Sequence, residues 1–386
     1  MKTIEERFTV AYSYPVVFCR DLFAEGSELL CEVLNREGGA GPKRVLVVMD
    51  RGVERAQPGL AGKVTAWLVA HRREVELVSP IEYVAGGEFS KKQDGVVERL
   101  VKVAYQTHFG RQDAFVVIGG GAVQDVVGFA AGQIHRGCRV VRVNTTTLSQ
   151  ADAGVGVKNG VDYAAAKNFL GTFAPPFAVI NDELFLPTLS DRDWRNGIAE
   201  AVKVAVIKDA AFLAWLTEKA EALRLRELPA MAELVERTAA LHLAHIAASG
   251  DAFERSSTRP LDFGHWSAHR LEAMTCYQLS HGEAVAIGIA LDMVYASLLG
   301  LVTPVESARV VALLQACGLR VWCPELALRG ADGHLAVLEG LRQFREHLGG
   351  ELCVTLPQGL GAKTEVHEMD EQLIEKAVAL LRERYA

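Results

Sequence analysis

The amino-acid sequence predicts an α/β protein in which a mainly parallel sheet is followed by a mostly α-helical region. Short apolar runs at 44–49 and 114–118 are typical of buried parallel strands, and they alternate with helical segments. From Trp194 onward, helical periodicity dominates. A chain of 386 residues suits more than one core. We therefore expect an α/β domain over 1–185 and a helical domain over 186–386.

The expected elements follow in chain order. An alternating, aromatic-rich stretch predicts an early strand at 8–18, and apolar runs predict strands at 44–49, 75–78, 114–118 and 139–143. Helices are expected between them at 64–72 and 96–107. Further helices are expected at 211–225, 231–248, 267–274, 284–299 and 371–385, with a short strand and a loop within 349–361. Strands that alternate with helices indicate an α/β layer.

Composition and charge narrow the classes of function. Half of the residues are hydrophobic and 23% are charged, as in ordinary globular proteins. The net charge of -7 disfavours nucleic-acid binding, which needs a basic face, but a local basic cleft could still hold an anionic substrate. The seven cysteines form no CxxC pair and indicate free thiols in a reducing compartment. With no signal-like or membrane-spanning apolar run, we expect a cytoplasmic protein that binds no membrane.

A glycine run lies where a nucleotide could bind. Gly119, Gly120 and Gly121 directly follow the strand at 114–118 and open a helix, whose free N–H groups could approach a pyrophosphate. The same run could be a simple tight turn, and its spacing is not GxGxxG. Asp50, at the end of the strand before it, could accept a ribose hydroxyl or cap a helix.

Carboxylate and imidazole side chains suggest a metal site. Glu200 lies in a small, apolar helical stretch, His265 and His269 have the i,i+4 spacing of one helix face, and His281 follows. One carboxylate and two imidazoles leave open positions on a divalent metal, which is a catalytic arrangement. A lone histidine is more often a surface or capping residue, so the residues alone do not choose among the three.

Five motifs occur in an order that resembles one superfamily. They are GGGAVQDVVGFAAGQIHRG from 119, NTTTLSQADAGVGVKNGVDYAAAKNFLGTF from 144, NGIAEAVKVAVIKD from 196, RPLDFGHWSAHRLE from 259 and HGEAVAIGIALD from 281. The chain resembles the sugar-phosphate cyclases, the superfamily of 3-dehydroquinate synthase, from about Phe8 to about Leu356. The resemblance implies a nucleotide-binding α/β domain and a helical metal-binding domain.

The resemblance also implies roles for individual residues. Zinc (or cobalt) would be bound by Glu200, His265 and His281. NAD would contact Asp50, Glu88, Lys91, Gly120, Gly121, Asp125, Thr145, Thr146, Lys158, Lys167, Phe185 and Thr188. A small phosphorylated sugar would contact Asp152, Lys158, Asn168, Lys203, His245, Arg259, Asp262 and His269. Arg136 resembles an arginine that reaches into a neighbouring subunit's site, which implies a homodimer.

The implied reaction is an elimination followed by ring closure. NAD takes up a hydride from the carbon that bears a metal-polarised hydroxyl, which leaves a ketone, phosphate leaves by β-elimination, and the hydride returns before an aldol closure. Lys158, Lys203, Asn168 and His269 would form a cluster for the phosphate, because cations and hydrogen-bond donors match a dianion.

Departures from dehydroquinate synthases concern the substrate. Asp262 stands where those enzymes usually have asparagine, and His245 takes the place of a lysine that precedes Arg259. These changes weaken a pocket for the carboxylate of a heptulosonate and suit the hydroxymethyl group of sedoheptulose 7-phosphate. The run FREHLGG at 344–350 resembles 2-epi-5-epi-valiolone synthases. His269 stands where many of those have proline, and GHWSAH resembles cyclases of ebo-type biosynthetic clusters.

We therefore expect an enzyme that makes 2-epi-5-epi-valiolone or an epimer. Three alternatives remain open. The first is a 3-dehydroquinate synthase with unusual residues, the second a metal-dependent dehydrogenase of the glycerol type, and the third a degenerate paralogue that serves as an interaction module.

Overall fold

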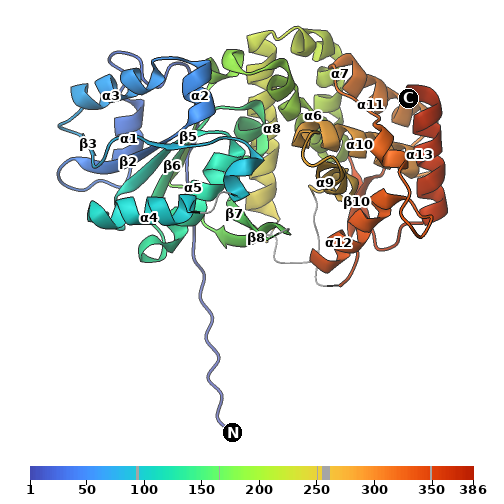
Figure 1. Cartoon of the computed structure of the whole chain (residues 1–386), viewed down its shortest axis with the longest axis horizontal. Coiled ribbons are helices and arrows are strands. Elements are labelled where there is room, and N and C mark those ends of the chain that lie inside the picture. Colours follow the sequence, from blue (N-terminus) through green and yellow to red (C-terminus); the bar gives the residue numbers. More distant parts are fainter. Residues whose placement is uncertain (93–94, 165, 250, 254–260, 348–349) are drawn as a thin grey trace. The chain divides into compact units, whose positions relative to one another are not determined.

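The computed structural model in Figure 1 describes residues 1–92, 95–164, 166–249, 251–253, 261–347 and 350–386. It consists of two compact units. The first comprises 1–143 and 157–181, and the second comprises 144–156 and 182–386.

A sheet of seven strands forms the core of the first unit. Its order is β1 (Val16–Cys19), β9 (Ala178–Asp182), β6 (Arg139–Asn144), β5 (Ala114–Gly119), β2 (Lys43–Asp50) and β3 (Val75–Leu77), and β4 (Glu82–Val84) also pairs with β2. Strand β2 is parallel to β3, β4 and β5. The apolar runs of β2 and β5 are buried, as expected for a parallel sheet between helices.

Helices alternate with these strands and confirm the α/β class. They are α1 (Leu29–Asn35), α2 (Arg51–Ala56), α3 (Leu60–Ala70), α4 (Val96–Gln106) and α5 (Gly121–Gln133), with 3-10 turns η1 (Glu88–Lys92) and η2 (Ile134–Arg136). Valine and leucine side chains of α4 and α5 pack on apolar residues of β2 and β5.

Two parts of the first unit differ from the prediction. The early strand, expected at 8–18, comprises only Val16–Cys19. The residues before it are largely exposed and run away from the sheet (Figure 1), so alternation of side chains alone did not make a strand there. An antiparallel hairpin of β7 (Lys158–Tyr163) and β8 (Ala166–Phe173) was not expected, because its sequence is rich in polar residues and glycine.

The second unit is mostly helical, as predicted. It contains α6 (Asp191–Lys208), α7 (Ala210–Arg224), α8 (Leu228–Ala248), α9 (His265–Met274), α10 (His281–Leu298), α11 (Pro304–Ala316), α12 (Glu339–His347) and α13 (Glu371–Tyr385). A hairpin of β10 (Val354–Pro357) and β11 (Lys363–Val366) adds to it, with 3-10 turns η4 (Glu183–Thr188), η5 (Pro324–Ala327) and η6 (Ala336–Leu338). Helices α6 and α10 are buried along most of their length and form the centre of the core.

The segment 144–156 belongs to the second unit by its contacts. The predicted division at 185/186 assigns it to the first domain instead. It forms a π-helical turn, η3 (Ser149–Ala153), in which Gly154 N–H donates to Ser149 O at 2.9 Å. The segment packs on α8 and α6, and the buried Gln150 Nε2 donates at 2.9 Å to both Asn144 O and Asp182 O. These contacts with residues distant in the sequence place segment 144–156 in the second unit.

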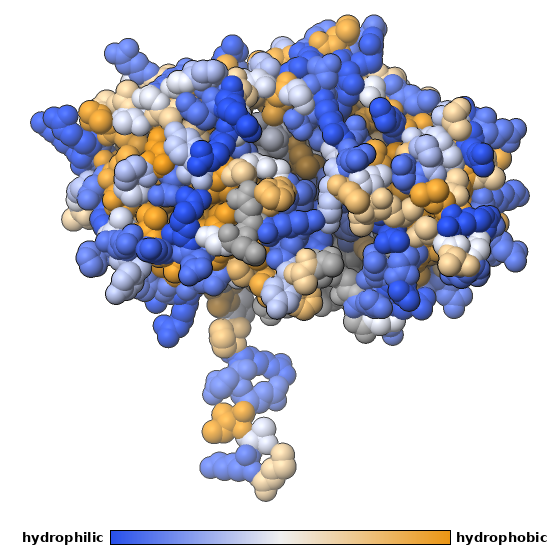
Figure 2. Space-filling view, viewed as in Figure 1, coloured by the Kyte–Doolittle hydropathy of each residue, from blue (hydrophilic) through white to orange (hydrophobic). Residues whose placement is uncertain are grey.

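Hydrophilic residues cover most of the face seen in Figure 2, with hydrophobic residues scattered among them. Within the described ranges, no helix combines the length and the apolar character needed to span a membrane.

Candidate metal centre and nucleotide-binding site

Three side chains from three helices of the second unit converge. Glu200 of α6, His265 of α9 and His281 of α10 each offer a ligand atom, and these atoms lie within 4.8 Å of one another. His265 Nε2 lies 3.5 Å and His281 Nε2 3.3 Å from Glu200 Oε1. The predicted metal-ligand residues are therefore brought together.

The other ring nitrogens are already occupied by acceptors. His265 Nδ1 lies 3.1 Å from Phe263 O, and His281 Nδ1 lies 3.3 Å from Glu272 Oε2. A carbonyl and a carboxylate require an N–H at each Nδ1, which leaves a lone pair on each Nε2 directed at Glu200. This tautomer and orientation are those of histidines that bind a metal, so the three residues fit a zinc-type ion.

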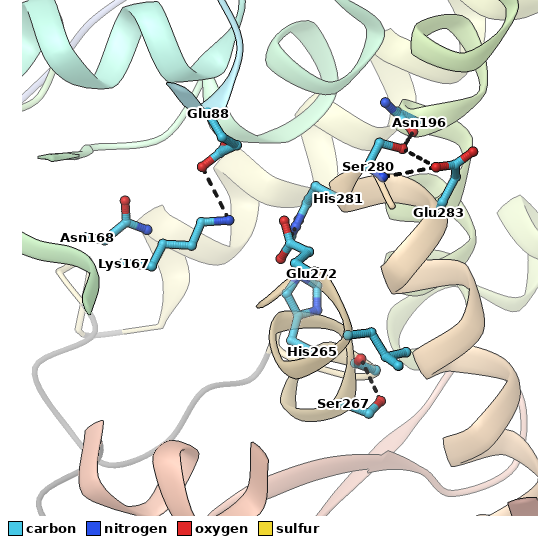
Figure 3. Close-up of polar contacts among 12 residues, drawn as sticks. Glu88, Lys167, Asn168, Asn196, His265, Ser267, Glu272, Ser280, His281 and Glu283 are labelled. Carbon is cyan, nitrogen blue, oxygen red and sulfur yellow. Dashed lines mark hydrogen bonds and ion pairs between the residues drawn. The ribbon is translucent and has the colours of Figure 1, made fainter. Parts of the chain in front are cut away.

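The first turn of α10 holds His281 in place. Ser280 caps the helix through a capping box with Glu283, and its hydroxyl donates to Asn196 Oδ1 of α6 at 2.7 Å (Figure 3). A Cβ added to Gly282 would lie 2.4 Å from Asn196 Cα. Only glycine fits there, so the His-Gly pair at 281–282 places the imidazole close to the helix that carries Glu200.

A second close approach fixes α9 against α10. Gly264 caps α9 with a φ of +79°, a conformation that favours glycine. A Cβ added to Gly288 of α10 would lie 2.0 Å from Gly264 O. The two histidine-bearing helices are therefore in backbone contact beside the cluster.

Lys203 and Asp152 extend the cluster. Lys203 Nζ lies 2.5 Å from Glu200 Oε2 and 4.0 Å from Asp152 Oδ2. Burial alone would raise the pKa of Glu200, but the Lys203 ammonium beside it outweighs burial and holds that pKa well below its ordinary value. Burial would also raise the pKa of Asp152, but Lys203 and His242 lower it below its ordinary value. Both carboxyl groups are therefore anionic at neutral pH.

His242 was not anticipated from the sequence. Its Nδ1 lies 2.5 Å from Asp152 Oδ1, and it lines a small cavity together with Asp152, Glu200 and Lys203. Its position three residues before His245 on α8 is the only sequence signal that could have drawn attention to it. Glu272 was also missed, although it follows His265 by seven residues and so lies on the same face of α9.

His269 lies near the cluster but is exposed. Its ring centroid is 5.4 Å from that of His265 and 6.0 Å from that of His281. His269, Glu272 and His281 could form an overlapping set of ligands. To bind a metal in that set, Glu272 would have to give up its contact with Nδ1 of His281. Glu200 already faces the Nε2 atoms of His265 and His281, so the set of Glu200, His265 and His281 fits a metal better.

The glycine run of the first unit has the predicted context. Gly120 is the N-cap between β5 and α5. The buried Gln124 of α5 donates through Nε2 to Val117 O at 3.0 Å and to Val143 O at 3.2 Å, which ties the start of the helix to β5 and β6. The strand, the glycine turn and the helix N-terminus form the kind of cradle that binds phosphate groups.

Asp50 caps helix α2, which confirms one of the two roles predicted for it. Its Oδ1 accepts from Gly52 N–H at 2.7 Å, and a Cβ added to Gly86 would lie 2.2 Å from Oδ2. Burial raises the pKa of Asp50 although the backbone N–H groups of Gly52 and Gly86 lower it. Contact with a ribose stays a prediction.

Residues predicted to bind NAD or substrate form a charged network in the first unit. Lys91 Nζ lies 2.5 Å from Asp125 Oδ2 and donates to Asn168 Oδ1 at 2.9 Å. Lys167 Nζ lies 3.3 Å from Glu88 Oε2 (Figure 3). Burial would lower the pKa of Lys91, but Asp125 and Glu88 raise it, so Lys91 remains a cation.

Comparison with family models identifies the chain. Residues 82–196 match the model described as 3-dehydroquinate synthase N-terminal, and residues 197–337 match 3-dehydroquinate synthase C-terminal. The chain belongs to the 3-dehydroquinate synthase family. Its relatives in this family include cyclases with different names, so membership alone does not fix the substrate.

Curated relatives include valiolone-type synthases and 3-dehydroquinate synthases. The chain is 36% identical over 275 residues to a 2-epi-5-epi-valiolone synthase of Streptomyces glaucescens, covering 71% of this chain and 69% of that one. It is 35% identical to a 2-epi-valiolone synthase of Actinosynnema mirum, with 88% and 86% covered. It is 31% identical to a 3-dehydroquinate synthase of a Ruegeria species, with 97% and 96% covered.

Solved structures agree with the family assignment. The 2-epi-5-epi-valiolone synthase ValA of Streptomyces hygroscopicus subsp. jinggangensis 5008, solved with NAD⁺ and Zn²⁺, matches with a TM-score of 0.85 and 30% identity over 99% of this chain and all of that one. A 2-deoxy-scyllo-inosose synthase matches with a TM-score of 0.74 at 20% identity over 94% of this chain and 95% of that one, which shows a common fold.

The remaining residues assigned from the family pattern lie in both units. Lys158 of β7 and Asn168 of β8 belong to the first, and Lys203 and His269 to the second, so the phosphate cluster stays a prediction. Arg259 lies outside the described residues. Asp262 is close enough to Lys203 to raise its pKa, and His245 is half-buried on α8.

Four of the residues predicted to contact NAD belong to the second unit. Thr146 N–H donates to the hydroxyl of Ser149 at 3.1 Å, which stabilises the turn that leads into η3. Thr145 beside it is buried. The hydroxyl of Thr188 donates to the carbonyl of the buried Phe185 at 2.6 Å within η4.

Proposed function

We propose that this protein is a sugar-phosphate cyclase that converts sedoheptulose 7-phosphate into 2-epi-5-epi-valiolone or an epimer, with release of phosphate. The end-to-end similarity to ValA, at a TM-score of 0.85 and 30% identity, carries this proposal. The first two relatives described above, both valiolone-type synthases at 36% and 35% identity, support it.

We further propose that NAD and zinc, or cobalt, are the cofactors. Glu200, His265 and His281 would hold the metal, and the glycine turn at Gly120 with the Lys91 network would hold the dinucleotide. The metal would supply polarisation of a substrate hydroxyl, and NAD would supply reversible hydride transfer without being consumed.

The chain's own residues would bind and orient the sugar phosphate. Lys203 is a buried cation between two anionic carboxylates, so it can donate a hydrogen bond to a substrate oxygen while remaining charged. Asp152 can accept from a sugar hydroxyl through the oxygen that His242 does not occupy. Lys158, Lys203, Asn168 and His269 would supply donors for the phosphate group, and Arg259 would contact the sugar.

Charge in the second unit favours a substrate without a carboxylate. Asp152, Glu200 and Asp262 all act on Lys203, so three carboxylates surround one lysine. A further carboxylate on the substrate would meet repulsion there. The hydroxymethyl group of sedoheptulose 7-phosphate would instead donate a hydrogen bond to Asp262.

The second candidate is 3-dehydroquinate synthase, which acts on 3-deoxy-arabino-heptulosonate 7-phosphate. Relatives of that name match over as much as 97% of the chain, at 31% identity. A probable glycerol dehydrogenase of Sinorhizobium meliloti matches at 16% identity with a TM-score of 0.61, which shows the fold alone.

We also propose that the enzyme is a cytoplasmic homodimer in which Arg136 reaches into the neighbouring subunit's site. Arg136 is exposed and lies in a turn where His135, Arg136 and Gly137 all have positive φ values, 53°, 65° and 123°. At His135 and Arg136, which are not glycine, such backbone conformations cost free energy and are common at functional sites.

A direct assay tests the proposed function. The purified protein, loaded with NAD and zinc or cobalt, is given either sugar phosphate separately, and release of inorganic phosphate and formation of the carbocycle are measured. We expect turnover of sedoheptulose 7-phosphate without net accumulation of NADH. Turnover of the heptulosonate alone would establish the second candidate, and NADH accumulating with glycerol would indicate a dehydrogenase.

A further inference from the structure

Asp292 of α10 is a buried carboxylate to which the proposed reaction assigns no role. Its exposed fraction is 0%, and burial raises its pKa to about 7 although two hydrogen bonds lower it. Its Oδ2 accepts from Gly264 N–H at 3.0 Å, and its Oδ1 accepts from the indole Nε1–H of Trp266 at 2.9 Å. Burying such a group costs free energy that an apolar residue at the same place would not.

The two donors lie on either side of His265. Gly264 is the N-cap of α9 and Trp266 belongs to its first turn, so Asp292 holds the backbone before the histidine and the side chain after it. A carboxylate at a helix N-terminus also interacts favourably with the helix dipole. Both contacts therefore fix where α9 begins and how it is rotated about its axis, which together set the direction of the His265 ring.

We infer that Asp292 is a positioning residue for His265, and that it sets the affinity and geometry of the metal site by anchoring Gly264 and Trp266. This inference rests on the proposed metal site. It completes a reciprocal arrangement of two helices. Helix α9 supplies Glu272, which orients His281 on α10, and α10 supplies Asp292, which orients the start of α9.

The chemistry of the two donors explains why the residue is a carboxylate. Aspartate offers two acceptor oxygens, whereas asparagine of the same shape offers one acceptor and one N–H₂ donor. In Asp292→Asn, one of the two N–H groups would face another N–H group. The start of α9 must then shift, or a buried donor stays unpaired.

The affinity of the purified protein for zinc tests the inference. It is measured by competition with a chelator, and the visible spectrum of the cobalt-loaded protein reports the ligand geometry. We expect Asp292→Asn to lower metal affinity by about 10-fold, the lower end of the range for loss of a group that directly orients a ligand, because Asp292 acts on His265 through Gly264 and Trp266. We also expect it to change the cobalt spectrum.

Tyr295→Phe is the matched control. Tyr295 lies three residues further along α10, is also buried, and accepts a hydrogen bond from Asp370 N–H at 2.9 Å, on the side of α13. Its loss removes a buried polar contact from the same helix and leaves in place the hydrogen bonds of Asp292 to Gly264 and Trp266. We expect it to lower the melting temperature and to leave zinc affinity and the cobalt spectrum unchanged.

Two further variants make the result decisive. Trp266→Phe removes one donor and should weaken metal binding less than Asp292→Asn. In the double variant the amide of the asparagine no longer faces the indole N–H, so part of the lost affinity should return. Trp266→Phe also provides the measurement if Asp292→Asn does not fold.

Unchanged zinc affinity in folded Asp292→Asn, or an equal loss in Tyr295→Phe, would overturn the inference. Failure of the wild-type protein to bind zinc would overturn it too. If the wild type binds zinc but does not cyclise the sugar phosphate, the proposed function fails while the positioning role of Asp292 stands.

Discussion

His242 illustrates how a single side chain can fix both the charge and the direction of a neighbour. Its Nδ1 is 2.5 Å from Asp152 Oδ1, and it lowers the pKa of that carboxyl group against the effect of burial. A Cβ on Gly156 would lie 3.3 Å from His242 Nε2, so the ring is enclosed on its other side as well. The imidazole therefore has little freedom to turn away from Asp152.

We predict that His242→Leu lowers kcat/KM for the sugar phosphate by about 10-fold or more, because a hydrogen bond to a charged group is worth about 1.5–3 kcal/mol. His242→Asn keeps an N–H donor near the position of Nδ1 and should retain most of the activity. Steady-state kinetics and zinc content measured on both variants check this. Zinc content should not change, so its loss in either variant would contradict a role limited to Asp152.

The residues of the metal site were predictable to the extent that they share a local pattern. Glu200, His265 and His281 stand in recognisable motifs, and the structure brings them together. The groups that orient the site, Glu272 on His281, His242 on Asp152 and Asp292 on Gly264, were not predicted, because their contacts join helices that meet only in the packed structure. A sequence identifies the groups that can bind a metal more readily than the groups that orient them.

At the level of the elements, the contact of α9 and α10 depends on two glycines that meet. Gly264 O occupies the place where a side chain on Gly288 would begin. Periodicity predicted both helices, with bounds that differ by a few residues from those observed, but it carries no information on which faces touch. The hairpin of β7 and β8 was missed for the same reason. It is formed by pairing of the two strands, which the composition of each strand does not reveal.

We predict that Gly288→Ala destabilises the protein by about 1–3 kcal/mol, the usual range for overpacking, and weakens zinc binding. The added Cβ, 2.0 Å from Gly264 O, must push the two helices apart. Gly62→Ala within α3 is the control, because a Cβ there meets nothing within 4 Å. Thermal unfolding and zinc titration of both variants check the prediction, which would be wrong if the two behaved alike.

At the scale of the whole molecule, the predicted site residues are divided between two units. The first contains the glycine turn and the Lys91 network, and the second contains the metal ligands, Lys203 and Asp152. The α/β and helical classes of the two units followed from the spacing of apolar residues. That spacing did not show that segment 144–156 belongs to the second unit, because its contacts with α6 and α8 join distant parts of the chain.

Mixing two inactive variants tests the proposed homodimer. In a mixed dimer of Arg136→Ala and Lys203→Ala, the subunit with intact Lys203 receives an intact Arg136 from its neighbour. With random exchange, about one quarter of the wild-type activity should return, since half of the dimers are mixed and each has one complete site. Lys203→Ala mixed with Glu200→Ala should stay inactive, because each site lacks a residue of its own subunit. No recovery in the first mixture would refute an arginine acting across the dimer.

The π-helical turn at Ser149–Ala153 has a consequence for how such a site can diverge. Its ring, closed from Ser149 O to Gly154 N–H, holds one residue more than an α-helical ring. Deleting that residue would rotate everything after it by about 100°. Asp152 and Gly156 could then no longer both face α8. Loss of a single codon in this segment would thus change which side chain faces α8, without any change to Glu200, His265 or His281.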